Sequence, residues 1–223
     1  MSARAPLRLA ILISGRGSNL SAVARACADG RINARPALVV ADRADAGGLA
    51  IARGLGIETA AVERCAFADR EAFEHAMDES LLNAGVSLIV LAGFMRILSP
   101  EFTSQHAGRM LNIHPSLLPK YRGLHTHRRV LEAGDAEHGA SVHFVTAELD
   151  GGPVVLQSRL PVRPGETEIA LAARVLETEH VIYPKVIGWL ADGRLQWRDG
   201  RPWLDGKPLD TPLVENFDAS AKR

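Results

Sequence analysis

Short apolar runs alternate with segments of helical periodicity along the first half of the chain. The runs lie at Leu9–Ile13, Ala37–Val40, Ser87–Leu91 and Met110–Ile113. The first and third are continuous, which is typical of strands that are buried on both faces of a parallel sheet. The segments between the runs predict helices over Asn19–Cys27, Gly47–Leu55 and Asp69–Leu82. This alternation predicts a doubly wound α/β sheet with mostly parallel strands and right-handed crossovers.

The pattern changes after residue 120. Apolar and polar residues alternate over Ser141–Val145 and Val154–Leu160, which flank a turn rich in Gly, and they predict an antiparallel extension of the sheet. A long helical pattern over Thr167–Leu190 contains Pro184, which we expect to kink the helix or to divide it in two. The segment Leu195–Leu204 has Asp-Gly at its centre and predicts a hairpin with a type I′ turn.

The composition is that of a folded globular protein without a strong charge bias. The chain has 223 residues, of which 47% are hydrophobic, and its 26 basic residues balance 26 acidic ones. A balanced charge does not support binding to nucleic acid or to an anionic membrane, so we expect small-molecule partners. No repeat or linker divides the sequence, and we predict one domain over residues 1–223, with a frayed polar tail from Thr211.

Neither the cysteines nor the amino terminus indicates export. Cys27 and Cys65 have no second Cys or His at ligand spacing, which argues against a disulfide framework and a zinc site. The first apolar run is too short for a secretory signal and is soon followed by Gly15. No apolar stretch approaches the length of about 20 residues that spans a bilayer. We therefore predict a cytoplasmic protein with free thiols.

Two polar residues, Asn112 and His114, stand where a buried strand is predicted to end. Residues two apart on a strand share a face, so both side chains point the same way. Pro115 cannot continue a central ladder, and it favours an extended backbone at His114. Ligands bind at this carboxyl edge in open α/β sheets. On these residues alone, a catalytic pair and a structural cap are equally well supported.

A loop rich in glycine and hydroxyl groups follows the first predicted strand. Its sequence, Ser14-Gly15-Arg16-Gly17-Ser18-Asn19, leads into the first predicted helix. Backbone N–H groups at the positive end of a helix bind anions, so the loop has the form of a phosphate cradle. It lacks the spacing of a dinucleotide motif and the Lys of a P-loop. The alternative is a tight turn that is capped by Ser18 or Asn19.

An unusually apolar loop follows the third predicted strand. The run from Leu91 to Pro100 contains Phe94, Met95, Ile97 and Leu98. Either these side chains pack under the next helix, or they line a pocket for a flat heteroaromatic group whose polar edge meets backbone groups. The spacing alone favours neither interpretation.

Asp150 lies in the turn Glu148-Leu149-Asp150-Gly151-Gly152-Pro153, where an aspartate most often only forms the turn. His143 precedes it on the adjacent predicted strand, and a carboxylate beside an imidazole favours the protonated form of the imidazole. His125 and His127 have the proximity of metal ligands, but no third ligand has a credible spacing. We therefore predict no metal site.

Taken together, four segments resemble the phosphoribosylglycinamide formyltransferases of purine synthesis. They are residues 13–20, 91–98, 112–119 and 149–153, and the resemblance extends in order from residue 9 to residue 204. The run Asn-x-His-Pro-Ser-Leu-Leu-Pro with a later Asp-Gly-Gly is shared with other folate-dependent formyl transferases. The segment at residues 13–20 narrows the resemblance to the enzymes that act on phosphoribosylglycinamide. The resemblance implies a Rossmann-like formyltransferase fold, with a phosphate-binding half at residues 7–115 and a folate-binding and catalytic half at residues 116–210.

The resemblance also implies roles for individual residues. The catalytic residues would be Asn112, His114 and Asp150. The ribonucleotide would be bound by Gly17, Ser18, Asn19 and Glu179. The formyl folate would be bound by Arg70, Met95, Arg96, Ile97, Leu98 and Asn112.

The chemistry implied by the resemblance is a direct transfer. The amine of phosphoribosylglycinamide would attack the formyl carbon of the cosubstrate 10-formyltetrahydrofolate, without a covalent enzyme intermediate and without a metal. Protonated His114 and the Asn112 amide would stabilise the oxyanion, a contact worth about 3 to 4 kcal/mol per donor. Asp150 would favour the protonated imidazole and relay the proton of the amine through water.

Two other interpretations are left open by the sequence. A methionyl-tRNA formyltransferase would need a further carboxyl-terminal domain, and a formyltetrahydrofolate hydrolase an additional amino-terminal one, for which we expect no room in 223 residues. A noncatalytic nucleotide-binding module would leave Asn112, His114 and Asp150 without a purpose. The sequence does not decide between a monomer and a homodimer, nor does it give the mobility of residues 120–130 or the isomer of the Leu118–Pro119 bond.

Overall fold

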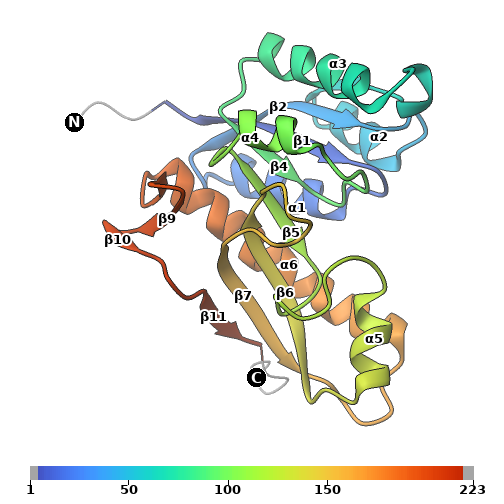
Figure 1. The fold of residues 1–223 in the computed structure, drawn as a ribbon, viewed down its shortest axis with the longest axis vertical. Helices are drawn as coiled ribbons and strands as arrows, with labels where there is room; N and C mark the ends of the chain where they lie inside the picture. The colour runs from blue at the N-terminus through green and yellow to red at the C-terminus, as the bar shows by residue number, and fades with distance from the viewer. Residues whose placement is uncertain (1–4, 218–223) are drawn as a thin grey trace.

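An eight-stranded sheet forms the centre of the molecule in the computed structural model, which describes residues 5–217 (Figure 1). The strand order is β11-β7-β6-β5-β4-β1-β2-β3. The strands are β1 (Leu7–Ile13), β2 (Ala34–Ala41), β3 (Glu58–Ala61), β4 (Leu88–Leu91), β5 (Met110–His114), β6 (Glu137–Phe144), β7 (Val154–Pro161) and β11 (Leu213–Asn216). β1 to β5 are parallel, β6 is antiparallel to both of its neighbours, and β11 is parallel to β7. The predicted sheet with its antiparallel extension is therefore confirmed.

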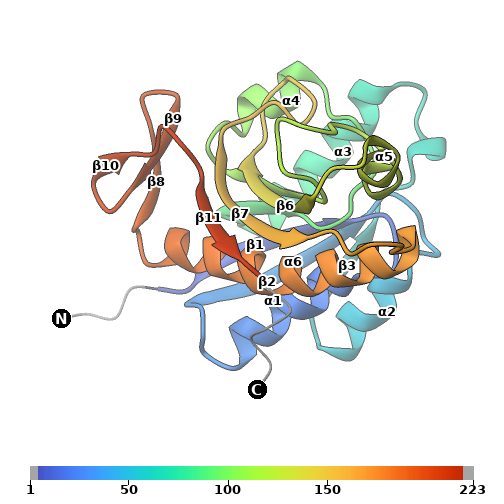
Figure 2. The ribbon, with the colours of Figure 1, turned by 90° about the horizontal axis from the view of Figure 1, so that it is seen from below.

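Helices cover both faces of this sheet (Figure 2). They are α1 (Ser18–Ala28), α2 (Gly47–Gly54), α3 (Arg70–Asn83), α4 (Pro100–Gln105), α5 (Thr126–Ala133) and α6 (Glu168–Ala191), with one 3-10 turn at Arg64–Ala66. Successive residues of a strand point to opposite faces, so β1 contributes to two cores. Leu9 and Ile11 pack on the side of α1, α2 and α6, whereas Ala10 and Leu12 pack on the side of α3 and α4.

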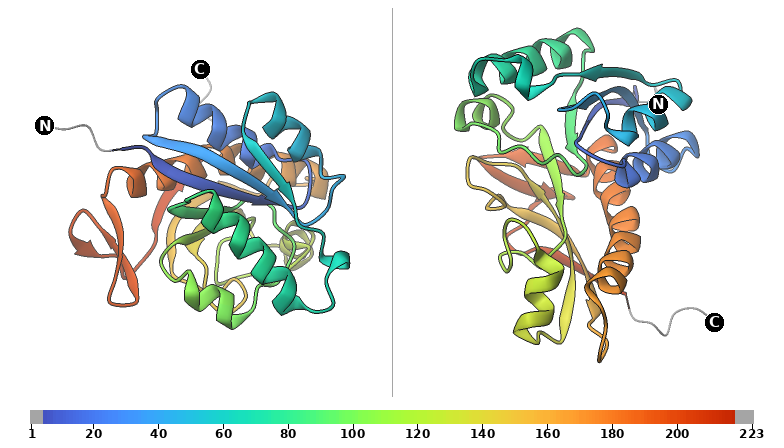
Figure 3. Two further views of the ribbon diagram at one scale, coloured as in Figure 1. Left: turned by 90° about the horizontal axis from the view of Figure 1, so that it is seen from above. Right: turned by 90° about the vertical axis from the view of Figure 1, so that its right-hand side faces the viewer.

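α6 runs alongside the sheet as one uninterrupted helix (Figure 3). The expected division at Pro184 is wrong. A proline inside a helix destabilises the helix by about 3 kcal/mol or more. Fully burying one large apolar side chain stabilises the fold by about 1.5 to 3 kcal/mol. Ile182, Val186 and Ile187 around the proline are all fully buried, and their packing keeps the helix intact. No helix within residues 5–217 combines the length and apolar character that a membrane crossing requires.

The edge strand β3 was not among the predicted elements. It has only four residues, Glu58–Ala61, and each is half-buried or exposed. A strand that lies at an edge and buries little apolar surface has no continuous apolar run, so the hydrophobic pattern does not reveal it.

The carboxyl-terminal segment confirms one expectation and corrects another. The predicted hairpin forms from β8 (Leu195–Arg198) and β9 (Arg201–Leu204), with the positive φ values of 51° and 74° at its two turn residues that a type I′ turn requires, and β10 (Lys207–Pro208) extends it. The prediction of a frayed tail is wrong for Leu213–Asn216, because these residues pair as β11 with the edge of β7. Backbone pairing with an open edge does not depend on an apolar pattern. Residues 218–223 of that tail lie outside the described residues, as do residues 1–4.

Tyr183 joins α6 to the two strands that end at the candidate site. Its hydroxyl lies 2.9 Å from the carbonyl oxygen of Leu91 in β4 and 3.0 Å from that of Leu111 in β5. The side chain is fully buried, so the hydroxyl proton is shared between these two acceptors.

Substitution of Tyr183 by Phe should destabilise the fold by about 1 to 3 kcal/mol, because the ring remains and only the buried hydrogen bonds are lost. The free energy of unfolding in urea measures this loss. Val181→Ala on the same helix is the control, since Val181 is 49% exposed and its loss should change stability by about 0.5 kcal/mol or less. Equal stability of Tyr183→Phe and the wild type would contradict a bracing role for the hydroxyl.

Candidate active site

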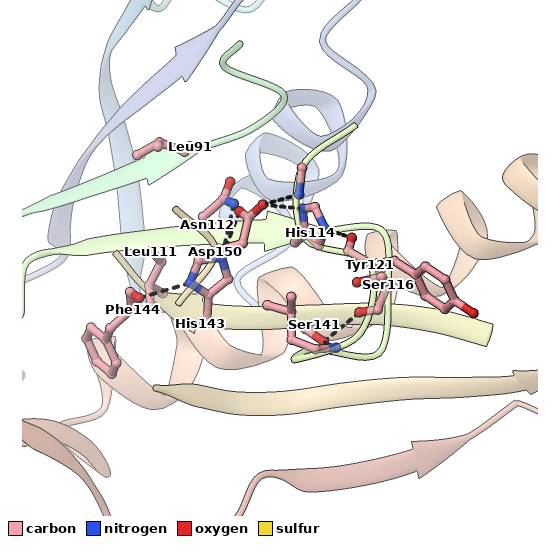
Figure 4. Close-up of polar contacts among 12 residues, drawn as sticks. Leu91, Leu111, Asn112, His114, Ser116, Tyr121, Ser141, His143, Phe144 and Asp150 are labelled. Carbon is pink, nitrogen blue, oxygen red and sulfur yellow. Dashed lines mark hydrogen bonds and ion pairs between the residues drawn. The ribbon is translucent and has the colours of Figure 1, made fainter. Parts of the chain in front are cut away.

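Asn112 and His114 lie on one face at the carboxyl end of β5, as the strand pattern predicted. β6 runs antiparallel beside them and places His143 opposite Asn112 and Ser141 opposite His114. Figure 4 shows these side chains with Asp150, which comes from the turn between β6 and β7. The sheet therefore brings two histidines, an amide and a carboxylate together at one edge.

Both ring nitrogens of His114 have a neighbour. Nε2 lies 2.9 Å from the backbone oxygen of Tyr121, and since a carbonyl can only accept, Nε2 carries a proton. Nδ1 faces Oδ2 of Asp150 at 3.4 Å. Asp150 therefore reaches His114, as the resemblance implied. Nδ1 is the nitrogen that can gain or lose a proton beside the carboxylate.

Asp150 is held in a strained and crowded turn. Its φ is 49°, in the left-handed region, and only 8% of its side chain is exposed. Its Oδ2 accepts a hydrogen bond of 2.9 Å from the backbone N–H of Gly123. A Cβ on Gly152 would meet the carbonyl oxygen of Phe144 at 1.9 Å, so glycine is needed for the turn to approach β6. The turn thus fixes where the carboxylate points.

The loop between β5 and α5 contributes backbone groups to the site. It supplies the Tyr121 carbonyl and the Gly123 N–H, and an ion pair between Arg122 and Glu148 links it to the turn of Asp150. The Leu118–Pro119 peptide bond in this loop is cis. Sequence reasoning missed both backbone contacts, because a main-chain donor or acceptor has no signature in residue type.

His143 contacts Asn112 directly. Its Nε2 lies 3.1 Å from Nδ2 of Asn112, its Nδ1 lies 2.9 Å from the carbonyl oxygen of Phe144, and Oδ1 of Asp150 is 3.8 Å from Nε2. Burial lowers the pKa of His143. The sequence indicated only that His143 precedes Asp150 on a neighbouring strand, and it gave no reason to pair it with Asn112.

The glycine-rich loop after β1 leads into α1 as predicted. Gly17, with a φ of 80°, precedes the first helical residue, Ser18. A Cβ on Gly17 would meet the Cα of Gly48 at 2.8 Å. Because the capping position is a glycine, no side chain there bonds the first N–H groups of the helix. The alternative of a turn capped by Ser18 or Asn19 is wrong, and the N–H groups at this end suit an anion.

Asn19 and Glu179 form a buried hydrogen bond beside this loop. Asn19 Nδ2 donates to Glu179 Oε2 at 2.7 Å, although the two residues are 160 positions apart. Burial raises the pKa of the Glu179 carboxyl to about 7. The structure therefore places Glu179 of α6 next to the segment that the resemblance assigns to the ribonucleotide.

The apolar loop after β4 contains both buried and exposed apolar side chains, so it packs into the core only in part. Phe94 and Leu98 are buried in the core, whereas Met95 and Ile97 are 65% and 61% exposed. The loop is attached to the glycine-rich loop, since Met95 N–H donates to Ser14 Oγ at 2.9 Å. Exposed apolar side chains on an anchored loop are suited to covering a flat ligand.

The two charged residues predicted to bind the folate lie in different surroundings. Arg96 in this loop pairs with the buried carboxylate of Asp42 at 2.5 Å. Arg70 begins α3 after the capping residue Asp69, and it lines a cavity of about 1000 Å³ with residues of α3 and α4. None of the described residues that line this cavity belongs to the group of Asn112, His114 and Asp150. The structure does not bring Arg70 together with that group.

The histidines with metal-like spacing have other contacts. His125 precedes α5 with a φ of 58°, and His127 Nδ1 lies 2.9 Å from Nε2 of His138. Within residues 5–217, no cluster of three or more His, Cys, Asp or Glu side chains could hold a metal. Cys27 and Cys65 are both free, and burial raises the pKa of the Cys27 thiol to about 11.

The Glu179 carboxyl should make stability depend on pH. Its native pKa of about 7 lies above the ordinary value of 4.5, so the native state binds the proton more tightly than the unfolded chain. The free energy of unfolding should therefore fall as the pH rises between these two values. Relative to Glu179→Gln, the wild type should lose roughly 2 to 4 kcal/mol across this window.

Urea unfolding of both proteins at several pH values measures this difference. Glu177→Gln is the matched control, because Glu177 is exposed on the same helix and its variant should follow the wild-type curve. Parallel curves for the wild type and Glu179→Gln would contradict the raised pKa.

Comparisons with known proteins agree with this arrangement. The family model described as Formyl transferase matches residues 7–187. The phosphoribosylglycinamide formyltransferase of Escherichia coli (strain K12) is 53% identical over 203 residues, which cover 91% of this chain and 96% of the relative. That of Haemophilus influenzae is 48% identical and covers 91% and 95%. The solved phosphoribosylglycinamide formyltransferase of Coxiella burnetii superposes with a TM-score of 0.90 at 46% identity, over 94% of this chain and 99% of that one.

The matched residues run from β1 into α6. They therefore include the glycine-rich loop, the carboxyl end of β5 and the turn of Asp150. Because the likeness covers nearly all of both chains in sequence and in structure, the chain belongs to the phosphoribosylglycinamide formyltransferase family of formyl transferases.

Proposed function

We propose that this protein transfers the formyl group of 10-formyltetrahydrofolate to the amine of phosphoribosylglycinamide in de novo purine biosynthesis. The observation that carries the proposal is the buried contact of His114 Nδ1 with Asp150 beside Asn112, at the sheet edge that also holds the glycine-rich loop. Membership of the family supports the same activity.

In the proposed reaction, Asn112 and His114 bind the formyl oxygen. When the amine attacks the formyl carbon, this oxygen becomes an oxyanion, and each preorganised donor near it contributes about 3 to 4 kcal/mol. Nε2 of His114 already donates to Tyr121, so Nδ1 is the donor for the reaction. Its distance of 3.4 Å from Asp150 is longer than a charge-assisted hydrogen bond, so a proton on Nδ1 can be shared with an oxyanion.

Asp150 takes part in the proton transfers that the reaction requires. A bond forms between the amine nitrogen and the formyl carbon, the bond from that carbon to N10 of the folate breaks, and one proton passes from the amine to N10. In our proposal the imidazolium of His114 protonates N10, and the proton of the amine returns through water to the pair of His114 and Asp150. The carboxylate favours the protonated imidazole throughout.

The substrates bind on either side of this pair in our proposal. Gly17, Ser18 and Asn19 hold the phosphate, and Glu179 contacts the ribonucleotide. Met95, Arg96, Ile97 and Leu98 bind the formyl folate. The positive end of α1 and the exposed apolar side chains of the second loop support these assignments. Arg70 is assigned to the folate by the resemblance alone.

We further propose that the chain acts as one formyltransferase domain, with phosphate binding in residues 7–115 and folate binding and catalysis in residues 116–210. The single central sheet that spans both parts supports this organisation. Free Cys27 and Cys65 suit a reducing compartment, so we place the enzyme in the cytoplasm, as a monomer or homodimer that needs no metal.

An assay with both substrates tests the function. Formyl transfer from 10-formyltetrahydrofolate should depend on phosphoribosylglycinamide, and the folate should be hydrolysed far more slowly when this acceptor is omitted. Hydrolysis at an equal rate without acceptor would instead indicate a formyl folate hydrolase. Binding of the ribonucleotide without any turnover or folate binding would indicate a noncatalytic nucleotide module.

Substitution of Asp150 by Asn should lower kcat by about 100-fold to 10,000-fold, because the amide cannot favour the imidazolium or accept a proton. The amide oxygen can still accept from Gly123, so the fold and both KM values should change little. Steady-state kinetics measure this split. Asp205→Asn in the carboxyl-terminal hairpin is the control, and turnover of Asp150→Asn equal to that control would contradict the role.

A further inference from the structure

His143 occupies a position next to the catalytic group that the proposed chemistry does not use. It lies on β6 directly opposite Asn112, and only 3% of its side chain is exposed. Both ring nitrogens are within hydrogen-bond distance of a protein atom, the carbonyl oxygen of Phe144 on one side and Nδ2 of Asn112 on the other (Figure 4). A buried imidazole with two fixed partners has a single protonation pattern that satisfies both.

The backbone decides this pattern. The carbonyl oxygen of Phe144 can only accept a hydrogen bond, so Nδ1 of His143 must carry a proton. In the neutral ring Nε2 then has no proton and presents a lone pair. A lone pair binds an N–H group and repels an oxygen, so the Asn112 amide must turn its nitrogen toward His143.

We propose that His143 is a positioning residue that, as its neutral Nδ1–H tautomer, fixes the amide orientation of Asn112 for catalysis. Nδ2 of Asn112 has two N–H groups, and only one is used by His143. The other remains available to the formyl oxygen and to the oxyanion that develops from it. The proposal rests on the proposed catalytic role of Asn112, and it deepens that role by naming what orients the amide.

Protonation of His143 would reverse this orientation. Nε2 would then donate, and the amide would rotate to present its oxygen, which would turn both N–H groups away from their present direction. Burial opposes such a proton, as do the positive charges of His114 and Arg122, whereas the Phe144 carbonyl and Oδ1 of Asp150 at 3.8 Å favour it. Burial is the largest effect and lowers the pKa of His143, so the neutral ring is the form present near neutrality.

The two histidines beside Asp150 differ in whether protonation would break one of their contacts. His114 places Nδ1 at 3.4 Å from Asp150, and its other nitrogen donates to a carbonyl, so it can become a cation without losing a contact. His143 would lose its contact with Asn112 on becoming a cation. The contacts of His114 are therefore compatible with a cation, whereas those of His143 require the neutral ring.

The tautomer can be observed directly. Two-bond proton–nitrogen NMR spectra of the ¹⁵N-labelled protein at neutral pH, with the ring signals assigned by their loss in His143→Gln, report which nitrogen carries the proton. We expect a protonated Nδ1 and an unprotonated Nε2 at His143. A protonated Nε2, either alone or together with Nδ1, would overturn the proposal irrespective of any kinetic result.

Kinetics test what the orientation contributes. His143→Phe fills the site but cannot accept from Asn112, so kcat should fall about 10-fold to 100-fold while both KM values stay within about threefold. His143→Gln offers an amide oxygen close to the place of Nε2 and should recover most of the lost kcat. A wild-type kcat for folded His143→Phe, or a Gln variant as slow as the Phe variant, would contradict the proposal.

Two further variants distinguish the positioning role of His143 from the catalytic role of Asn112 on which it rests. In an Asn112→Ala background, His143→Phe should cause no additional loss of kcat, because no amide is left to orient. Near-normal turnover of Asn112→Ala alone would refute the catalytic role of Asn112, whereas a slow Asn112→Ala beside a normal His143→Phe would refute only the positioning role. His106→Phe is the matched control, since it removes another buried imidazole, one that is bonded to Asp78, and it should leave kcat within about twofold.

Discussion

The buried carboxylate of Asp150 determines how the catalytic end of the sheet is assembled. A charge whose side chain is 8% exposed is costly unless donors surround it, and here the donors come from separate parts of the chain. Gly123 N–H donates to Oδ2, and His114 Nδ1 faces the same oxygen. These contacts to one carboxylate therefore attach the loop after β5 to the turn after β6. They also hold the imidazole of His114 beside the carboxylate with which it exchanges a proton in the proposed reaction.

The antiparallel pairing of β5 with β6 brings side chains from both strands to the site. In the parallel half of the sheet, strands end at the same edge, and that edge holds the glycine-rich loop and the apolar loop. β6 returns antiparallel beside β5, so its last residues lie against Asn112 and its following turn carries Asp150 over the site. The antiparallel extension thus supplies His143 and Asp150, which are half of the polar side chains of the site.

Hydrophobic pattern and residue chemistry together predict the central strands, the crossover helices and the polar positions at their ends, because these features belong to side chains. Asn112 and His114 could be placed at a strand end for this reason. The contact between His114 and Asp150 was implied only by the family resemblance, because the sequence does not show how far the turn of Asp150 reaches. The Tyr121 carbonyl and the Gly123 N–H could not be found in the same way, since every residue has such groups. β11 depends on backbone pairing with an exposed edge, and the continuity of α6 through Pro184 depends on packing that only the assembled core provides.

α6 connects the two halves of the site through polar residues that are one helical turn apart. Glu179 bonds Asn19 at the start of α1, and Tyr183 bonds the carbonyls of Leu91 and Leu111 just before the apolar loop and Asn112. Buried polar groups of this kind stabilise a fold little compared with apolar packing, but they fix relative positions because any displacement leaves them unsatisfied. The glycine-rich loop, the apolar loop and Asn112 are therefore set by one rigid helix. The Tyr121 and Gly123 contacts to His114 and Asp150 come instead from the backbone of the loop after β5, so the geometry of proton transfer depends on the position of that loop.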